Sequence, residues 1–150
     1  MSKGYKFLNT IITIATAIIY FSGMLYHFLS GSYLTLALSL STFAVGFIFC
    51  SALRIIINAP RPYETGHGDN LLGKTTEGKS FPSRHVFSIF CIAMIISAYF
   101  LIPGLILFAA GVLLCFLRVK TKVHFVRDVV AGAILGTAIG IIPLIFRIIS

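Results

Sequence analysis

Long uncharged apolar runs dominate this chain and predict helices that cross a membrane. No charged side chain occurs from Phe7 to Leu53, and two further uncharged runs cover Val86–Leu117 and Val129–Phe146. A helical crossing needs about 20 apolar residues, and inside a bilayer only helices or closed barrels satisfy every backbone hydrogen bond. The pattern predicts an all-α fold, a multi-pass transmembrane helical bundle in which residues 1–150 form a single membrane-embedded domain.

Polar interruptions set the boundaries of about five crossings. Ser30-Gly31-Ser32 divides the first run, and Pro103-Gly104 is expected to form a tight turn. Ser80 is a suitable cap for the third helix, with Pro82 in its first turn. The expected helices cover about 7–29, 33–57, 82–102, 104–117 and 124–148. The fourth has so short an uncharged part that we expect flanking cations to extend it, or the bilayer to thin around it.

Composition and charge restrict the partners. The segment 58–80 contains Pro60, Pro62, four glycines and three of the four acids, so it is expected to be an exposed loop. The chain is 58% apolar and 11% charged, with a formal net charge of +8. Because the cations lie at the ends of apolar runs, we expect membrane lipids and a phosphorylated lipid substrate as partners, and no nucleic acid.

Five crossings bring four polar positions to one membrane face. These are Arg54 with Arg61 after the second helix, Ser83 to His85 at the start of the third, Arg118 at the end of the fourth, and His124 with Asp128 at the start of the fifth. Ionisable residues at membrane depth are costly and usually functional. Their convergence predicts a functional site at that end of the bundle.

His124 and Asp128 are expected to form a dyad. If the fifth helix begins near His124, the two residues lie one turn apart on one helix face. The carboxylate then accepts the proton of one imidazole nitrogen and leaves the other lone pair free to attack phosphorus. Arg54 and Arg61 are expected to hold a tetrahedral anion, although arginines also simply flank transmembrane helices.

The start of the third helix is expected to bind an anion. Pro82-Ser83-Arg84-His85 presents the N–H groups of a first turn, to which the Ser83 hydroxyl adds a donor. His85 is placed to give a proton to a departing alkoxide. His67, with Glu64 and Asp69, is a weak metal candidate, and we expect neither a metal nor another cofactor.

Glycine occurs at every fourth position of the fifth helix, at Gly132, Gly136 and Gly140. In lipid such a stripe lets another helix backbone approach closely. We expect the stripe to pack inside the bundle rather than to form a dimer, and the oligomeric state stays open.

Three motifs in order resemble the signature of a known family. Arg54 is followed after six residues by Arg61-Pro62, then come Pro82-Ser83-Arg84-His85, and then Arg118, His124 and Asp128. This is similar to the tripartite signature of the type-2 phosphatidic acid phosphatase superfamily, which includes membrane lipid phosphate phosphatases and shares its site with vanadium haloperoxidases. The resemblance implies that His124 is the nucleophile, that Asp128 orients it, and that His85 is the general acid and then the base. The phosphate-binding residues it implies are Arg54, Arg61, Ser83 and Arg118.

The chain also departs from the family pattern. Arg54 stands where members usually have Lys, Leu117 where they have Ser, and Arg84 where they have Gly. Members commonly have six crossings, whereas five are expected here. Arg84 adds a cation to the phosphate-binding turn, which either holds a second phosphate of the substrate or faces lipid head groups.

The resemblance implies an integral membrane phosphatase that removes a terminal phosphate through a phosphohistidine and without a metal. The expected substrate is a phospholipid such as phosphatidic acid, or a polyprenyl (di)phosphate such as undecaprenyl diphosphate. Two alternatives are open: a lipid-phosphate binding or transport protein that keeps the anion site without catalysis, and a haloperoxidase-like enzyme that uses vanadate.

The expected location is the plasma (cytoplasmic) membrane, with two indications about its orientation. Most of the remaining lysines and arginines flank the active face, which favours the cytoplasmic side under the positive-inside rule. The family favours the extracytoplasmic side, and we adopt that side because cations near a phosphate site also attract anionic lipid.

Overall fold

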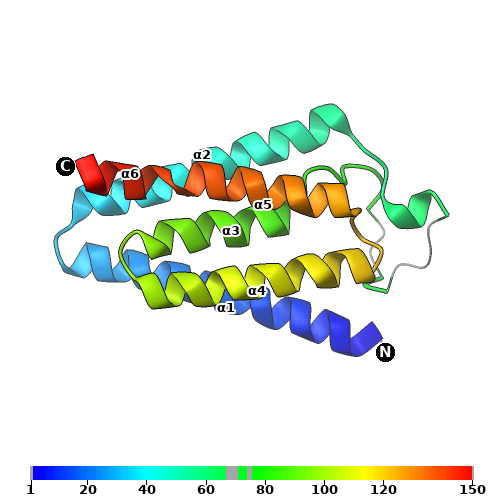
Figure 1. Cartoon of the computed structure of the whole chain (residues 1–150), viewed down its shortest axis with the longest axis horizontal. Helices are drawn as coiled ribbons and strands as arrows, with labels where there is room; N and C mark the ends of the chain where they lie inside the picture. Colours follow the sequence, from blue (N-terminus) through cyan, green and yellow to red (C-terminus); the bar gives the residue numbers. More distant parts are fainter. Residues whose placement is uncertain (1, 67–70, 74–75, 150) are drawn as a thin grey trace.

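A computed structural model describes residues 2–66, 71–73 and 76–149, and it is a bundle of helices (Figure 1). The elements are α1 (Ser2–Leu29), α2 (Tyr33–Ile57), the 3-10 helix η1 (Pro62–Glu64), α3 (Arg84–Ser97), α4 (Leu101–Lys120), α5 (Val126–Gly140) and α6 (Ile142–Ile149). The described residues contain no strand. The all-α prediction is confirmed.

α3 occupies the centre of the bundle, and the longer helices surround it. Its residues from Val86 to Ile96 are nearly all buried, and it packs against α1, α2, α4 and α5. At about 1.5 Å per residue, a helix of its length is about 21 Å long, which is shorter than the roughly 30 Å hydrocarbon core of a bilayer. α3 therefore depends on its neighbours to cover its polar ends.

Besides α3, four helical segments of the described chain are long and apolar enough to cross a membrane. The candidate spans are Lys3–Leu29, Tyr33–Glu64, Leu101–Lys120 and Val126–Ile149. Their outward faces expose large apolar side chains such as Ile18, Phe49, Phe116 and Ile134. A soluble monomer rarely exposes so much contiguous apolar surface, whereas lipid chains cover it without cost. The prediction of a membrane-spanning bundle is confirmed.

The glycine stripe of α5 packs against the backbone of α3. A Cβ atom added at Gly132 would lie 2.7 Å from the carbonyl oxygen of Ser83, and one at Gly136 would lie 3.0 Å from the backbone nitrogen of Cys91. Any side chain at these positions would separate the two helices. The prediction that the stripe serves packing inside the bundle is confirmed.

The start of the third helix differs from the sequence prediction. We expected Ser80 to cap it, with Pro82 in the first turn, but α3 begins at Arg84 and its N-cap residue is Ser83, in an extended conformation. Ser80 does not cap α3, because its hydroxyl donates a hydrogen bond to Asp128 of α5. The local sequence predicts that the Ser80 side chain caps the helix, but in the structure that side chain makes a tertiary contact instead.

The end of α3 also lies earlier than expected, at Ser97 rather than Ile102. The connection to α4 is the segment 98–100, and Pro103 lies in the first turn of α4 instead of forming a turn before it. Proline is tolerated there because the first N–H groups of a helix have no intrahelical acceptor. Gly104 then lets α4 approach α3, since a Cβ atom there would lie 2.7 Å from the Cα of Ser97.

The last two predicted helices require correction. α4 covers Leu101–Lys120, which is 20 residues. It begins three residues earlier than expected, and Arg118 and Lys120 extend its last turn, which was the first of our two expectations for this short helix. The single helix expected at about 124–148 is divided at Ile141 into α5 and α6. Pro143 explains the division, because it has no N–H group to continue the hydrogen-bond ladder of α5.

Candidate active site

Four helix ends meet at one end of the bundle, on the right of Figure 1: the C-terminal ends of α2 and α4 and the N-terminal ends of α3 and α5. Hydrogen bonds join them directly. The Ser83 N–H donates to the Asp128 carbonyl oxygen at 2.9 Å, and Arg61 Nη1 donates to the Val123 carbonyl oxygen at 3.3 Å. Residues of all three motifs therefore lie at one end of the bundle, as the predicted crossings require.

His124 and Asp128 form a buried pair. His124 Nδ1 lies 3.5 Å from Asp128 Oδ2, and the two side chains are 2% and 0% exposed. The expectation that both lie on one helix face is wrong, because α5 begins at Val126 and His124 precedes it. The pair forms nonetheless, since Asp128 lies in the first turn, where its carboxylate turns back and accepts the N–H of Phe125 at 3.0 Å.

Burial controls the protonation of His124, which lies in the connection between two candidate spans. Loss of solvation, with a smaller contribution from the nearby charges of Arg118 and Arg61, lowers the pKa of His124 from 6.5 to about 4, against the opposing effect of Asp128. The imidazole is therefore neutral at pH 7. With Nδ1 directed at Asp128, the lone pair of Nε2 is available for reaction.

Ser80 is a site residue that the sequence reasoning missed. It is fully buried, its Oγ donates a hydrogen bond to Asp128 Oδ2, and the same oxygen lies 3.3 Å from His124 Nδ1. The hydroxyl thus accepts from the imidazole while it donates to the carboxylate, and it holds both in one arrangement. No local signal indicates this role, because Ser80 is more than 40 residues away from both partners in sequence.

Arg118 has the character of an anion-binding residue. Its side chain is fully buried, and all three of its guanidinium nitrogens lie without a hydrogen-bond partner in the described structure, as does the buried Oγ of Ser83. A buried cation without a partner is strongly unfavourable. An anion with several acceptor oxygens satisfies such donors, and the planar guanidinium matches the geometry of a phosphate.

Arg61 and Arg54 donate hydrogen bonds to backbone carbonyl oxygens of the segments that connect the helices at this end of the bundle. Arg61 is 2% exposed, and its Nε donates to the Gly78 carbonyl oxygen at 3.0 Å, in addition to its bond with the segment before α5. Arg54 Nη1 donates to the Pro82 carbonyl oxygen at 3.3 Å. A guanidinium carries five N–H donors, so these contacts use only part of its capacity. Their charges add to that of Arg118.

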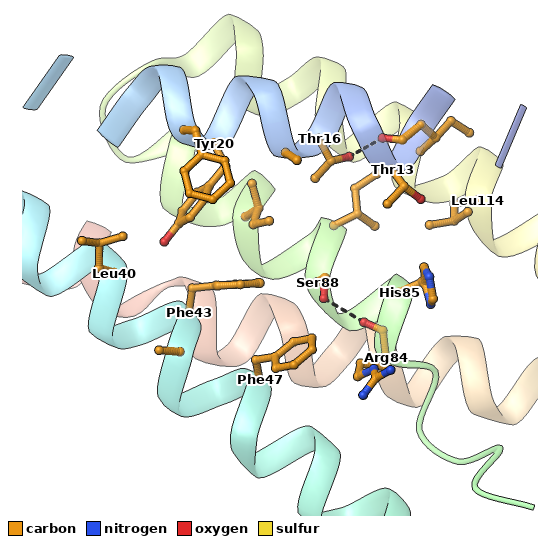
Figure 2. A pocket seen from close by; sticks show the side chains of 16 residues that line it. Thr13, Thr16, Tyr20, Leu40, Phe43, Phe47, Arg84, His85, Ser88 and Leu114 are labelled. Atoms are coloured by element: carbon orange, nitrogen blue, oxygen red, sulfur yellow. Dashed lines mark hydrogen bonds between the residues drawn. The ribbon is translucent and has the colours of Figure 1, made fainter. Parts of the chain in front are cut away.

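Arg84 and His85, the first residues of α3, line an open cavity of about 530 Å³ whose walls come mainly from α1, α2 and α3 (Figure 2). The guanidinium of Arg84 lies over the Phe47 ring, 5.3 Å from its centre. The rest of the lining is mostly apolar, and includes Ile12, Ala17, Phe21, Leu40, Phe43, Ala44 and Leu114. The cavity thus joins a hydrocarbon-like interior to the polar first turn of α3.

The metal candidate is only partly described. His67 and Asp69 lie outside the described residues, so their arrangement with Glu64 is not defined. Among residues 2–66, 71–73 and 76–149, no group of three or more His, Cys, Asp or Glu side chains is arranged to hold a metal ion.

Comparisons with known proteins show the family of this chain and a related fold. The sequence profile of the PAP2 superfamily matches residues 32–149, and the chain belongs to that superfamily, which includes membrane lipid phosphatases. The fold is similar to the crystal structure of LpxE from Aquifex aeolicus, with a TM-score of 0.73 and 26% sequence identity over 92% of this chain and 86% of that chain. Among curated protein sequences, none matches this chain significantly.

Replacing Ser80 by Ala tests its positioning role. We expect kcat to fall about tenfold with little change in KM, because the contacts of the hydroxyl are with His124, the predicted nucleophile, and with Asp128. The acidic limb of the pH profile should also move to higher pH, since Asp128 without the hydroxyl stabilises protonated His124 more strongly. Steady-state kinetics across pH with one substrate measure both effects.

The matched control for this variant is Ser39→Ala, which removes another buried hydroxyl from the interior of α2. A raised KM with unchanged kcat, or a pH profile identical to that of the parent protein, would show that Ser80 does not position the dyad.

Proposed function

We propose that this chain is a lipid phosphate phosphatase that removes the terminal phosphate of a phospholipid or a polyprenyl (di)phosphate. The observation that carries the proposal is the fully buried guanidinium of Arg118, without a partner among the described residues, at the end of the bundle that also holds the His124–Asp128 pair. A phosphate supplies the acceptors that Arg118 requires and the phosphorus atom that a neutral imidazole attacks.

The proposed reaction is an in-line displacement at phosphorus. His124 Nε2 attacks and forms a P–N bond, while the P–O bond to the lipid breaks and His85 gives its proton to the departing oxygen. Water, deprotonated by His85, then attacks the phosphohistidine and releases inorganic phosphate. Asp128 stabilises the positive charge that develops on His124 in the first step.

Fixed positive charge is the proposed means of stabilising the transition state. Arg54, Arg61 and Arg118 surround the phosphate, and the backbone N–H groups at the start of α3 with the Ser83 hydroxyl add neutral donors. These groups supply the field that a metal ion supplies in other phosphatases, so we propose a reaction without a metal or another cofactor.

The apolar cavity supports a lipid as the substrate. Its volume lies within the range of about 300–1,000 Å³ that small-molecule sites usually have, and His85 stands at its polar end (Figure 2). Because His85 is the proposed donor to the leaving oxygen, the hydrocarbon chain attached to that oxygen extends into the cavity. The alternative of a binding or transport protein without catalysis accounts for the cavity but gives no role to the buried dyad.

Replacing His124 by Gln tests the proposed chemistry. We expect phosphate release from a panel of lipid phosphates to fall by at least about a thousandfold, because the nucleophile is lost while the size of the side chain is kept. The matched control is His27→Gln, since His27 is also buried but ends α1 at the opposite end of the bundle. The measurement is inorganic phosphate released by the purified, folded variants.

Three other results would contradict the proposal. Near-normal release by His124→Gln would exclude the phosphohistidine, and complete loss of activity with a chelator would favour a metal mechanism. Binding of lipid phosphates without release by the parent protein would favour the binding or transport function.

A larger side chain in the cavity tests the lipid-chain assignment. Ala44 lines the cavity from α2, and we expect Ala44→Phe to lower kcat/KM for long-chain lipid phosphates about tenfold more than for a water-soluble phosphate ester, because the ring occupies the space of the chain. Ala37→Phe is the control, since Ala37 is exposed on the same helix and does not line the cavity. Equal effects on both substrates would exclude the assignment.

We further propose that the active face lies on the extracytoplasmic side of the plasma membrane. The basis is the family, while the exposed Lys3, Lys6, Lys79, Lys120 and Lys122 of this face favour the opposite orientation. A membrane-impermeant maleimide on intact cells should label Lys120→Cys at the active end and not Ser30→Cys at the other end. The reverse labelling would place the active face in the cytoplasm.

A further inference from the structure

Arg84 lies where the apolar cavity meets the arginines of the site. It packs over Phe47 of α2 and lines the cavity together with His85 and Ser88 (Figure 2). Its positive charge also acts on Arg54 at the end of α2. Arg84 is therefore within electrostatic reach of both the phosphate-binding residues and the end of the cavity.

The backbone places no special demand on this position. Arg84 is the first residue of α3, and its φ angle is not among the positive ones, so glycine is not required. Its carbonyl oxygen accepts a hydrogen bond from Ser88 Oγ at 2.9 Å, which is an ordinary contact within a helix. What distinguishes the position is the cationic side chain itself.

The charge of the site exceeds that of one phosphate. Arg54, Arg61, Arg84 and Arg118 contribute four positive charges, and the one carboxylate among the motif residues, Asp128, interacts with His124 and Ser80. A phosphate monoester carries about −1.5 to −2 charges at pH 7. A further anionic group on the substrate brings the charges closer to balance, which matters because partly buried charges require compensation.

We propose that Arg84 binds a second phosphate, the one that stays with the leaving group, so that the site prefers lipid diphosphates to lipid monophosphates. This inference rests on the proposed function, in which Arg118 binds the terminal phosphate and the cavity holds the hydrocarbon chain. Arg84 lines the cavity, and its charge acts on Arg54, so it stands where the cavity reaches the phosphate-binding residues. In a diphosphate substrate the group that joins the terminal phosphate to the hydrocarbon chain is the second phosphate.

The reaction on such a substrate is balanced. His124 Nε2 forms a bond to the terminal phosphorus while the bond from that phosphorus to the bridging oxygen breaks. The bridging oxygen takes the proton of His85 and departs as part of a lipid monophosphate, whose negative charge Arg84 stabilises. Water then cleaves the P–N bond, releases inorganic phosphate and restores His124.

The test compares a polyprenyl diphosphate with the monophosphate of the same chain, using the purified full chain in a neutral detergent. We expect Arg84→Gln to lower kcat/KM for the diphosphate about tenfold to a hundredfold more than for the monophosphate, because a charged hydrogen bond to the second phosphate is lost. Arg84→Lys keeps the charge and should recover part of the preference. The control is Lys120→Gln, which removes an exposed cation from the same end and should affect both substrates equally.

Three outcomes overturn the inference. They are an equal loss on both substrates with Arg84→Gln, a parent protein that hydrolyses the monophosphate at least as well as the diphosphate, and a loss that appears only when anionic lipid is added, which would assign Arg84 to neighbouring head groups. His124→Gln in the same assays separates this failure from that of the proposed function. If His124→Gln is inactive on both substrates while Arg84→Gln shows no selectivity, only the role of Arg84 is lost.

Discussion

The close backbone contact between α3 and α5 is the constraint on which the site depends. Gly132 and Gly136 leave no side chain between the two helices, and lipid offers little hydrophobic drive for helices to associate, so contacts of this kind hold a membrane bundle together. The same contact sets the N-cap residue Ser83 beside Asp128, whose carbonyl oxygen accepts its N–H. The packing that stabilises the bundle therefore also fixes the second motif against the third.

The two buried arginines, Arg61 and Arg118, differ in whether their guanidinium groups have hydrogen-bond partners among the described residues. Arg61 donates to the carbonyl oxygens of Gly78 and Val123, so it joins the long loop to the segment before α5 and contributes its charge at the same time. Arg118 is equally buried but has no such partner among the described residues. Loss of solvent, and to a smaller extent the neighbouring cations, hold the pKa of His124 well below its usual value. One electrostatic environment thus favours an anion and keeps the imidazole of His124 neutral.

Local sequence patterns predicted some elements well and others wrongly, for identifiable reasons. The range of α2 is predicted correctly because Ser30-Gly31-Ser32 and Pro60 bound an apolar run. The predicted start of α3 is wrong because Ser80, although it is a residue type that caps helices, donates its hydroxyl hydrogen bond to Asp128, which is far away in sequence. The His124–Asp128 pair is predicted correctly for the wrong reason, since Asp128 turns back from the first turn of α5 toward a residue that precedes the helix.

The sequence by itself determined that the chain forms membrane-spanning helices and that the residues of the three motifs gather at one end of the bundle. Both follow from the lengths of the apolar runs and the order of the motifs, which can be read directly along the chain. Only the tertiary structure decided that Ser80 contacts both His124 and Asp128 and that Arg84 stands at the end of an apolar cavity. It also decided that Arg118 is buried without a hydrogen-bond partner among the described residues, while Arg61 has two. These features depend on contacts between segments tens of residues apart. No periodicity or local propensity encodes the depth and direction of a side chain within such packing.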